Sequence, residues 1–154
     1  MRSDASEPRT DSAATSSTTV RFVDTNVLLY AISTDAEEQA KSEQANAILA
    51  ARDLVLSVQV LQEFYVQATR RSRADRLTHS QAAALVESFL RFRVVEITSG
   101  LLLAALATRE RFEISYWDAA ILEAARAAGC ELLLSEDLSH GQDYAGVRVE
   151  NPFG

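Results

Sequence analysis

The sequence predicts an α/β fold of three layers (α/β/α), with a mostly parallel central sheet of four to five strands between two layers of helices. Two observations support this prediction. Short apolar runs of strand length alternate along the chain with longer segments whose apolar residues recur at helical spacing. The 154 residues, 47% of them apolar, are enough for one domain with a substantial core. Right-handed crossovers in such a sheet bring the carboxyl ends of the parallel strands to one edge.

The start of the chain differs in composition from the rest. Residues 1–19 are rich in Ser, Thr, Ala and Asp without apolar periodicity, so we expect a disordered leader there and one folded domain over residues 20–154. We find no apolar stretch typical of a secretory signal, and no apolar run approaching the ~18 residues of a membrane span. Cys130 is the only cysteine, so no internal disulfide can form, and we expect a cytoplasmic protein.

The first expected strand, Val20–Val23, ends at a polar segment. Its residues are β-branched or aromatic apart from Arg21. Asp24, Thr25 and Asn26 then supply side chains that cap a helix, and an apolar run with helical spacing follows. The Asp24 carboxylate is therefore expected at the carboxyl edge of the sheet, where open α/β sheets bind their ligands.

The next segments continue the alternation of helix and strand. Asp35–Ala51 is rich in Ala, Glu and Gln and predicts an amphipathic helix. The expected apolar side of this helix consists of Ala40, Ala47, Ile48 and Ala51. Leu54–Ser57 is an apolar run of strand length, and Val58–Arg71 follows it directly with helical spacing.

The second half of the chain shows the same pattern. Ser80–Phe92 and Leu101–Arg111 have the apolar spacing of helices. Tyr116–Ala128 is Ala-rich, and Gly129 follows it at the position that favours glycine after a helix. Apolar residues predict the remaining strands at Val94–Thr98, Leu132–Ser135 and Val147–Val149.

Four acidic residues are expected at or just beyond the carboxyl edge of the sheet: Asp24, Glu63, Asp118 and Asp137. Singly, each has a structural explanation as a helix-capping acid or an exposed helical glutamate. As a group, ionised carboxylates a few ångström apart repel unless they are protonated or a cation neutralises them. Oxygen ligands without a histidine pattern suit a hard divalent ion, so the sequence predicts Mg²⁺ or Mn²⁺ at this edge.

The predicted metal site suits phosphodiester hydrolysis. A bound divalent ion lowers the pKa of a water molecule, polarises the phosphate and stabilises the leaving alkoxide, so no cysteine or histidine nucleophile is required. The side chains expected to hydrogen bond the carboxylates, or to hold a metal-bound water, are those of Thr25, Asn26 and Ser135. Tyr116 and Trp117 are expected to anchor Asp118 against the core.

Four segments in this order resemble the PIN-domain family and, within it, the VapC-like toxins of bacterial type II toxin–antitoxin pairs. They are Phe22–Leu28, Ser57–Phe64, Tyr116–Ile121 and Leu133–Leu138, with Asn151–Phe153 closing the chain. The resemblance covers roughly residues 20–153. It implies an Mg²⁺- or Mn²⁺-dependent endoribonuclease that acts on RNA, is inhibited by a partner antitoxin and forms a homodimer.

The resemblance also implies roles for individual residues. The acidic quartet of the family falls on Asp24, Glu63, Asp118 and Asp137. We expect Asp24, Asp118 and Asp137 to bind the metal, with Glu63 binding directly or through water. Ser135 occupies the position of a hydroxyl residue that is more often Thr. Glu136 is the alternative to its neighbour as fourth ligand, but the spacing Ser135-x-Asp137 favours Asp137.

Other functions remain open at this stage. A PIN fold without activity could serve as an RNA-binding or interaction module, and another carboxylate-metal nuclease would use the same residues. Haloacid dehalogenase-type phosphotransferases also place an Asp after the first strand, but they have a second Asp where this chain has Asn26. They and response-regulator receivers need a lysine at the sheet edge, whereas Lys41, the only lysine, lies in an early predicted helix.

Overall fold

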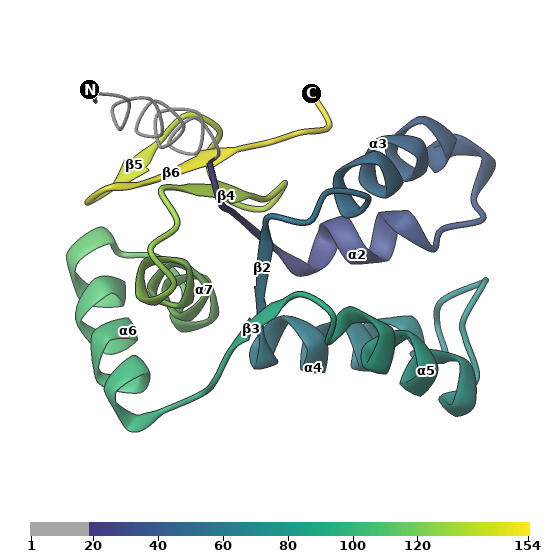
Figure 1. Cartoon of the computed structure of the whole chain (residues 1–154), viewed down its shortest axis with the longest axis horizontal. Helices are drawn as coiled ribbons and strands as arrows, with labels where there is room; N and C mark the ends of the chain where they lie inside the picture. The colour runs from purple at the N-terminus through teal and green to yellow at the C-terminus, as the bar shows by residue number, and fades with distance from the viewer. Residues whose placement is uncertain (1–18) are drawn as a thin grey trace, which may run out of the picture.

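Strands and helices alternate along the chain in the computed structural model, which describes residues 19–154 (Figure 1). The expected disordered leader lies outside the described residues, except for the exposed Thr19. The strands of the one sheet are β1 (Arg21–Val23), β2 (Leu54–Ser57), β3 (Arg93–Val95), β4 (Leu132–Leu134), β5 (Asp143–Tyr144) and β6 (Val147–Glu150). The helices are α2 (Thr25–Ala31), α3 (Gln39–Leu49), α4 (Val58–Ala68), α5 (His79–Phe89), α6 (Ser99–Phe112) and α7 (Tyr116–Ala127), with a 3₁₀ turn η2 (Ala36–Glu38).

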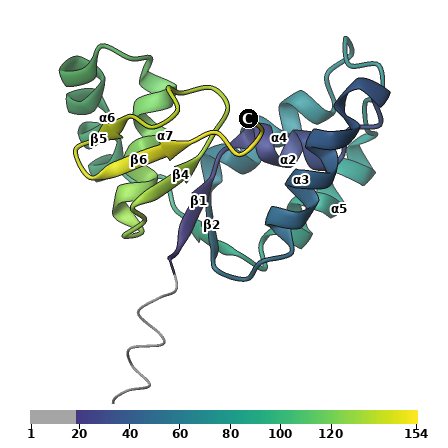
Figure 2. The same ribbon diagram turned by 90° about the horizontal axis from the view of Figure 1, so that it is seen from above.

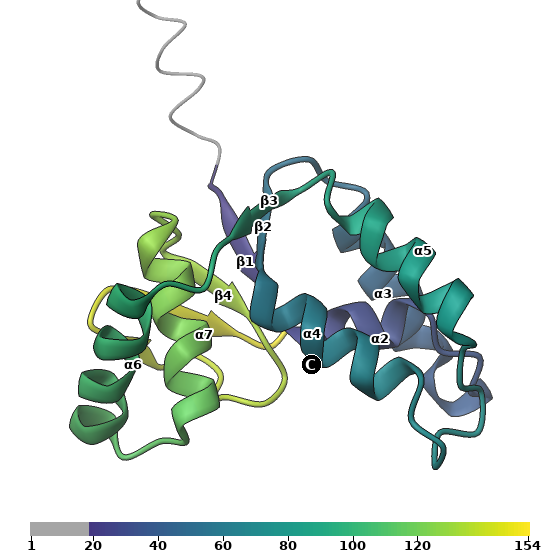
Figure 3. The same ribbon diagram turned by 90° about the horizontal axis from the view of Figure 1, so that it is seen from below.

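The sheet confirms the predicted α/β fold. Its strand order is β3-β2-β1-β4-β6-β5, and all neighbours are parallel except the antiparallel pair β5–β6. The chain runs outward from β1 to β3 and then returns past β1 to β4. As Figure 3 shows, α2 to α5 lie on one side of the sheet and α6 and α7 on the other.

The core lies on both faces of the central strands. All four residues of β2 are buried, as are Phe22 and Val23 of β1. Burial on both faces explains why these strands are continuous apolar runs. The C-terminus lies beside α2 (Figure 2), where the ring of Phe153 meets that of Tyr30 edge to face at 4.8 Å between centroids. No helix among residues 19–154 combines the length and apolar character needed to cross a membrane.

The strands differ from the prediction in number and extent. The sheet has six strands rather than four to five, because Asp143–Tyr144 pairs with the start of β6 in a tight hairpin. Its two turn residues, Ala145 and Gly146, both have positive φ, as a two-residue hairpin requires. The third strand ends at Val95 instead of reaching Thr98, because the Thr98 side chain caps α6 by accepting a hydrogen bond from the Leu101 amide.

The helices also differ from the prediction at their ends and on one face. Asp35 caps the 3₁₀ turn η2, so the regular helix α3 begins only at Gln39. In α3 the buried residues are Ala45 and Leu49, whereas Ala40 and Ala47 of the expected apolar side are exposed. Small alanines contribute little burial, so the larger leucine decides which side of the helix packs. Further differences are that α4 ends at Ala68, and that α5 starts at His79 and ends at Phe89.

Candidate active site

The carboxyl ends of β1 and β4 lie side by side at the point where the strand order reverses. Asp24 follows β1 directly, and Ser135 follows β4. The Asp24 amide donates to the Leu134 carbonyl at 3.0 Å, which extends the pairing of the two strands by one residue. A reversal of this kind leaves a crevice at the sheet edge in which α/β proteins bind ligands.

Asp24 is a buried carboxylate with both oxygens hydrogen bonded. Only 4% of the residue is exposed. Oδ1 accepts from the Thr25 amide at 2.7 Å, and Oδ2 accepts from the Ser135 hydroxyl at 2.7 Å. Burial raises the pKa of Asp24 from its ordinary 3.8 to about 7; the two hydrogen bonds oppose this rise, and the charges of Asp137 and Glu63 add to it. The site therefore favours a proton or a cation beside Asp24.

Glu63 reaches the same place from α4. The Thr25 hydroxyl donates to Oε1 of Glu63 at 2.8 Å, and the Gln59 amide donates to Oε2 at 3.1 Å. The same Gln59 nitrogen lies 3.3 Å from the main-chain oxygen of Trp117, which ties α4 to the first turn of α7. Sequence reasoning missed Gln59, although a glutamine one helical turn before Glu63 is placed to hydrogen bond with it.

Asp137 lies in the loop after β4 and is bound by Asn26. The Asn26 amide donates to Oδ2 of Asp137 at 3.2 Å, and its carbonyl accepts from the Glu136 main-chain amide at 3.3 Å. The Asp137 amide in turn donates to the Ser135 hydroxyl at 3.1 Å. Thr25, Asn26 and Ser135 thus each hydrogen bond an acidic side chain of the predicted set, and Asp137 itself is exposed.

Glu136 points to different partners from those of Asp137. Its two carboxylate oxygens accept from the Tyr30 hydroxyl at 2.6 Å and from the Lys41 ammonium at 2.7 Å. Burial acts to raise the pKa of Glu136, but these two hydrogen bonds and the charge of Lys41 outweigh it and lower the pKa. These contacts occupy both oxygens of Glu136, and they involve Tyr30 and Lys41, which sequence reasoning did not find.

Asp118 is joined to the group by charge rather than by a hydrogen bond. It is half-buried in the first turn of α7, where its amide donates to the Ser115 hydroxyl at 3.0 Å. Burial raises its pKa, a hydrogen bond with Ser115 lowers it, and the charges of Asp137 and Glu63 raise it further. The expectation that Trp117 anchors Asp118 against the core is wrong, because Trp117 is 62% exposed.

The donor set of this edge fits a hard divalent cation. The acidic side chains offer oxygen atoms only, and a cation among them would offset the burial and the carboxylate repulsion that raise the pKa of Asp24 and of Asp118. Within residues 19–154, however, no three His, Cys, Asp or Glu side chains are grouped closely enough to hold a metal ion. The less buried side chains of Glu63, Asp118 and Asp137 would have to turn toward Asp24 to bind one.

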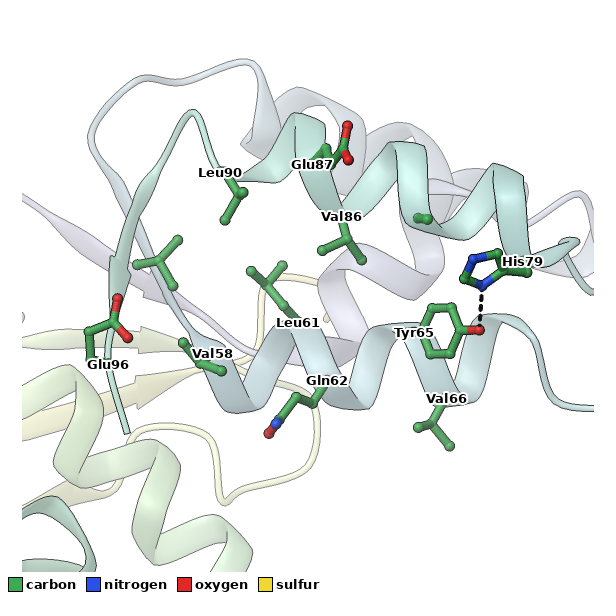
Figure 4. Close-up of a pocket in the computed structure, with 12 residues that line it drawn as sticks. Val58, Leu61, Gln62, Tyr65, Val66, His79, Val86, Glu87, Leu90 and Glu96 are labelled. Carbon is green, nitrogen blue, oxygen red and sulfur yellow. Dashed lines mark hydrogen bonds between the residues drawn. The ribbon is translucent and has the colours of Figure 1, made fainter. Parts of the chain in front are cut away.

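A larger groove lies away from these carboxylates, between α4 and α5 (Figure 4). It has a volume of about 780 Å³ and is lined mainly by apolar side chains such as Leu61, Val86 and Leu90. At one end the Tyr65 hydroxyl is 2.8 Å from Nδ1 of His79. No group of metal-binding side chains forms in the described part of the chain, this groove included, so its chemistry suits an apolar contact.

The fold and part of the sequence match known proteins. The family model of the PIN domain matches residues 21–142. Similar solved structures include a toxin–antitoxin complex from Klebsiella pneumoniae, with 21% identity, a TM-score of 0.62 and coverage of 86% of this chain and 97% of that one.

Two further structures share the fold. Mycobacterium tuberculosis VapC20, described as a sarcin-ricin loop cleaving toxin, has 22% identity, a TM-score of 0.59 and coverage of 76% and 91%. DNA-bound VapBC from Salmonella typhimurium has 18% identity, a TM-score of 0.60 and coverage of 88% and 99%. No curated protein matches the sequence. Because the family model spans most of the chain, the protein belongs to the PIN domain family.

Proposed function

We propose that the protein is a metal-dependent endoribonuclease that hydrolyses RNA phosphodiester bonds and is the toxin component of a toxin–antitoxin pair. One observation carries this proposal: Glu63, Asp118 and Asp137 come from separate elements to the sheet edge where Asp24 is buried with its pKa raised to about 7. Membership of the PIN family supports it. So do the names of similar structures, which include a toxin–antitoxin complex and a toxin described as cleaving the sarcin-ricin loop.

In this proposal the acidic residues hold Mg²⁺ or Mn²⁺. Asp24, Asp118 and Asp137 would bind the ion, and Glu63 would bind it directly or through water. The ion, when bound, supplies an acidified water molecule and stabilises negative charge on the phosphate. The protein holds these carboxylates in place through hydroxyl and amide groups, because carboxylates without fixed partners would lose the geometry that the reaction needs.

The neutral side chains have distinct roles in that arrangement. Ser135 donates to Asp24 and fixes the plane of its carboxylate. Thr25 and Asn26, at the start of α2, hold the carboxylates of α4 and of the loop after β4. Thr25 and Asn26, directly after β1, therefore hold side chains that lie more than thirty positions further along the chain.

A partner antitoxin, a homodimer and a cytoplasmic location complete the proposal. An accessible nuclease site would damage the RNA of its own cell, so an inhibitor that covers the carboxylates is expected. An antitoxin helix can bind an apolar groove and extend a basic side chain toward the carboxylates. The groove between α4 and α5 is one apolar surface available to the antitoxin or to a second copy.

The proposal is tested by incubating labelled cellular RNA with protein freed from any co-purified partner by denaturation and refolding. The reactions contain Mg²⁺, Mn²⁺ or EDTA, and they compare the wild type with Asp24→Asn. Glu131→Gln serves as the control, because Glu131 is an exposed carboxylate before the start of β4. Metal-dependent cleavage that only Asp24→Asn lacks is expected. A refolded protein that binds RNA but neither cleaves it nor binds Mn²⁺ would instead be a binding module.

A further inference from the structure

A smaller hollow of about 270 Å³ lies beside the carboxylates. One wall is the face of α4 formed by Gln59, Gln62, Glu63, Val66 and Gln67, and the other is Trp117 of α7. Glu63 belongs both to this wall and to the candidate active site, and Trp117 directly precedes Asp118. The hollow therefore adjoins the site. It shares Gln62 and Val66 with the apolar groove of Figure 4, whose other lining residues include Leu61, Val86 and Leu90.

The Trp117 ring is exposed and packs against the ring of its neighbour Tyr116. The main-chain oxygen of Trp117 accepts from Gln59, and the rings of Tyr116 and Trp117 pack edge to face at 5.0 Å between centroids. Even so, 62% of Trp117 is exposed to solvent. A flat and exposed aromatic ring is the surface on which proteins stack unpaired bases of RNA.

The opposite wall offers groups that match the edges of a base. Gln62 is exposed and Gln67 half-buried, and a glutamine amide both donates and accepts hydrogen bonds. In Figure 4, Gln62 and Val66 point from α4 away from α5. The Glu63 carboxylate at this wall would repel a phosphate but can accept from a base amino group. These properties suit a neutral base better than the RNA backbone.

We propose that Trp117 and the glutamines of α4 form a subsite for one unpaired RNA base next to the bond that is cut. The proposal rests on the proposed function for the identity of its ligand. A base stacked on Trp117 would bring its own phosphodiester toward the carboxylates, because Glu63 and Asp118 adjoin the hollow. The subsite would thus select single-stranded RNA, whose bases are free to stack on a protein side chain.

Trp117 is the only tryptophan of the chain, so its fluorescence reports on the subsite directly. The measurement uses Asp24→Asn protein, which leaves RNA uncut, and two single-stranded oligoribonucleotides of equal length, one normal and one lacking its bases. The normal RNA should quench the emission, and the base-free RNA should not. If the normal RNA changes the tryptophan emission no more than the base-free RNA does, the proposal is overturned.

Variants test the same subsite by the anisotropy of labelled RNA. Trp117→Ala should weaken binding about tenfold and raise KM more than it lowers kcat, whereas Trp117→Phe should retain most of the affinity. Leu103→Ala is the control, because Leu103 is 65% exposed on α6, on the other face of the sheet from α4. Equal losses in the alanine and phenylalanine variants would contradict base stacking.

The remaining outcomes separate this proposal from the nuclease assignment. Wild-type protein that cuts RNA while its tryptophan is not quenched would overturn the base subsite and leave the ribonuclease standing. Base-dependent quenching in a protein that never cuts RNA would support the subsite and overturn the nuclease. A blue shift of the emission on concentrating RNA-free protein would show that a second copy covers Trp117, and it would overturn the subsite.

Discussion

Replacing Asp24 by asparagine should abolish cleavage and at the same time stabilise the metal-free protein. The rise of the Asp24 pKa from 3.8 to about 7 means that ionising this carboxylate in the folded state is unfavourable. At 1.36 kcal/mol per pH unit, the difference corresponds to about 4 kcal/mol in the free energy of unfolding above pH 7. Asparagine has nearly the same shape and carries no charge, so the variant avoids this cost.

The hydrogen bonds of Asp24 can largely survive the substitution. The Thr25 amide can still donate to the side-chain oxygen of asparagine, and the Ser135 hydroxyl can turn to accept from its amide nitrogen. These two hydrogen bonds become weaker because the side chain is no longer charged, and this weakening offsets part of the gain. We therefore expect the variant to be more stable than the wild type by about 2–4 kcal/mol at pH 8 in EDTA.

The pH dependence distinguishes this cause from a simple change in packing. Between pH 3.8 and about 7 the folded wild type binds more protons than the unfolded chain, so its stability falls as the pH rises through this range. The advantage of Asp24→Asn should therefore grow by about 2–3 kcal/mol between pH 5 and pH 8. Urea unfolding in EDTA at the two pH values measures this difference in stability, with Glu131→Gln as the control.

Adding Mg²⁺ at pH 8 should then stabilise the wild type and leave Asp24→Asn almost unchanged, because the ion binds the carboxylate that the variant lacks. If the difference in stability between Asp24→Asn and the wild type stays constant with pH, the charge of Asp24 is not what destabilises the wild type. Cleavage by the variant at the wild-type rate would refute the site itself.

Three further comparisons of variants test the contacts around the site, all by the kinetics of RNA cleavage and by urea unfolding. Asp137→Asn should reduce cleavage far more than Glu136→Gln, and equal losses would contradict the choice of Asp137 as ligand. Lys41→Met should free the Glu136 carboxylate to turn toward the site and lower cleavage several-fold. Adding Glu136→Gln should then restore cleavage. A double variant no more active than Lys41→Met would show that Glu136 does not interfere with the site. Gln59→Leu should lower cleavage about tenfold and stability by about 1 kcal/mol, because it frees Glu63 and leaves a main-chain oxygen without its partner. If Gln59→Leu lowers stability but leaves cleavage unchanged, Gln59 has only a structural role.

The sequence by itself determined the layered α/β fold and the position of Asp24 and Ser135 at the carboxyl edge of the sheet. Both follow from local information, because an apolar run predicts a strand and the residue after it must lie at that strand's carboxyl end. Asp24 and Ser135 were placed in this way, and the structure joins them by a hydrogen bond. The family was also visible in the order of four short segments, and the match over residues 21–142 agrees with it.

Only the tertiary structure decided where individual side chains point. Glu136 and Asp137 are neighbours with similar chemistry, but their hydrogen-bond partners differ, because Lys41 and Tyr30, about a hundred residues earlier, bind Glu136. Trp117 is likewise exposed, opposite to the prediction, and its main-chain oxygen accepts from Gln59 of α4, which is far away in the sequence. Such contacts join residues far apart in the chain, so local periodicity carries no information about them.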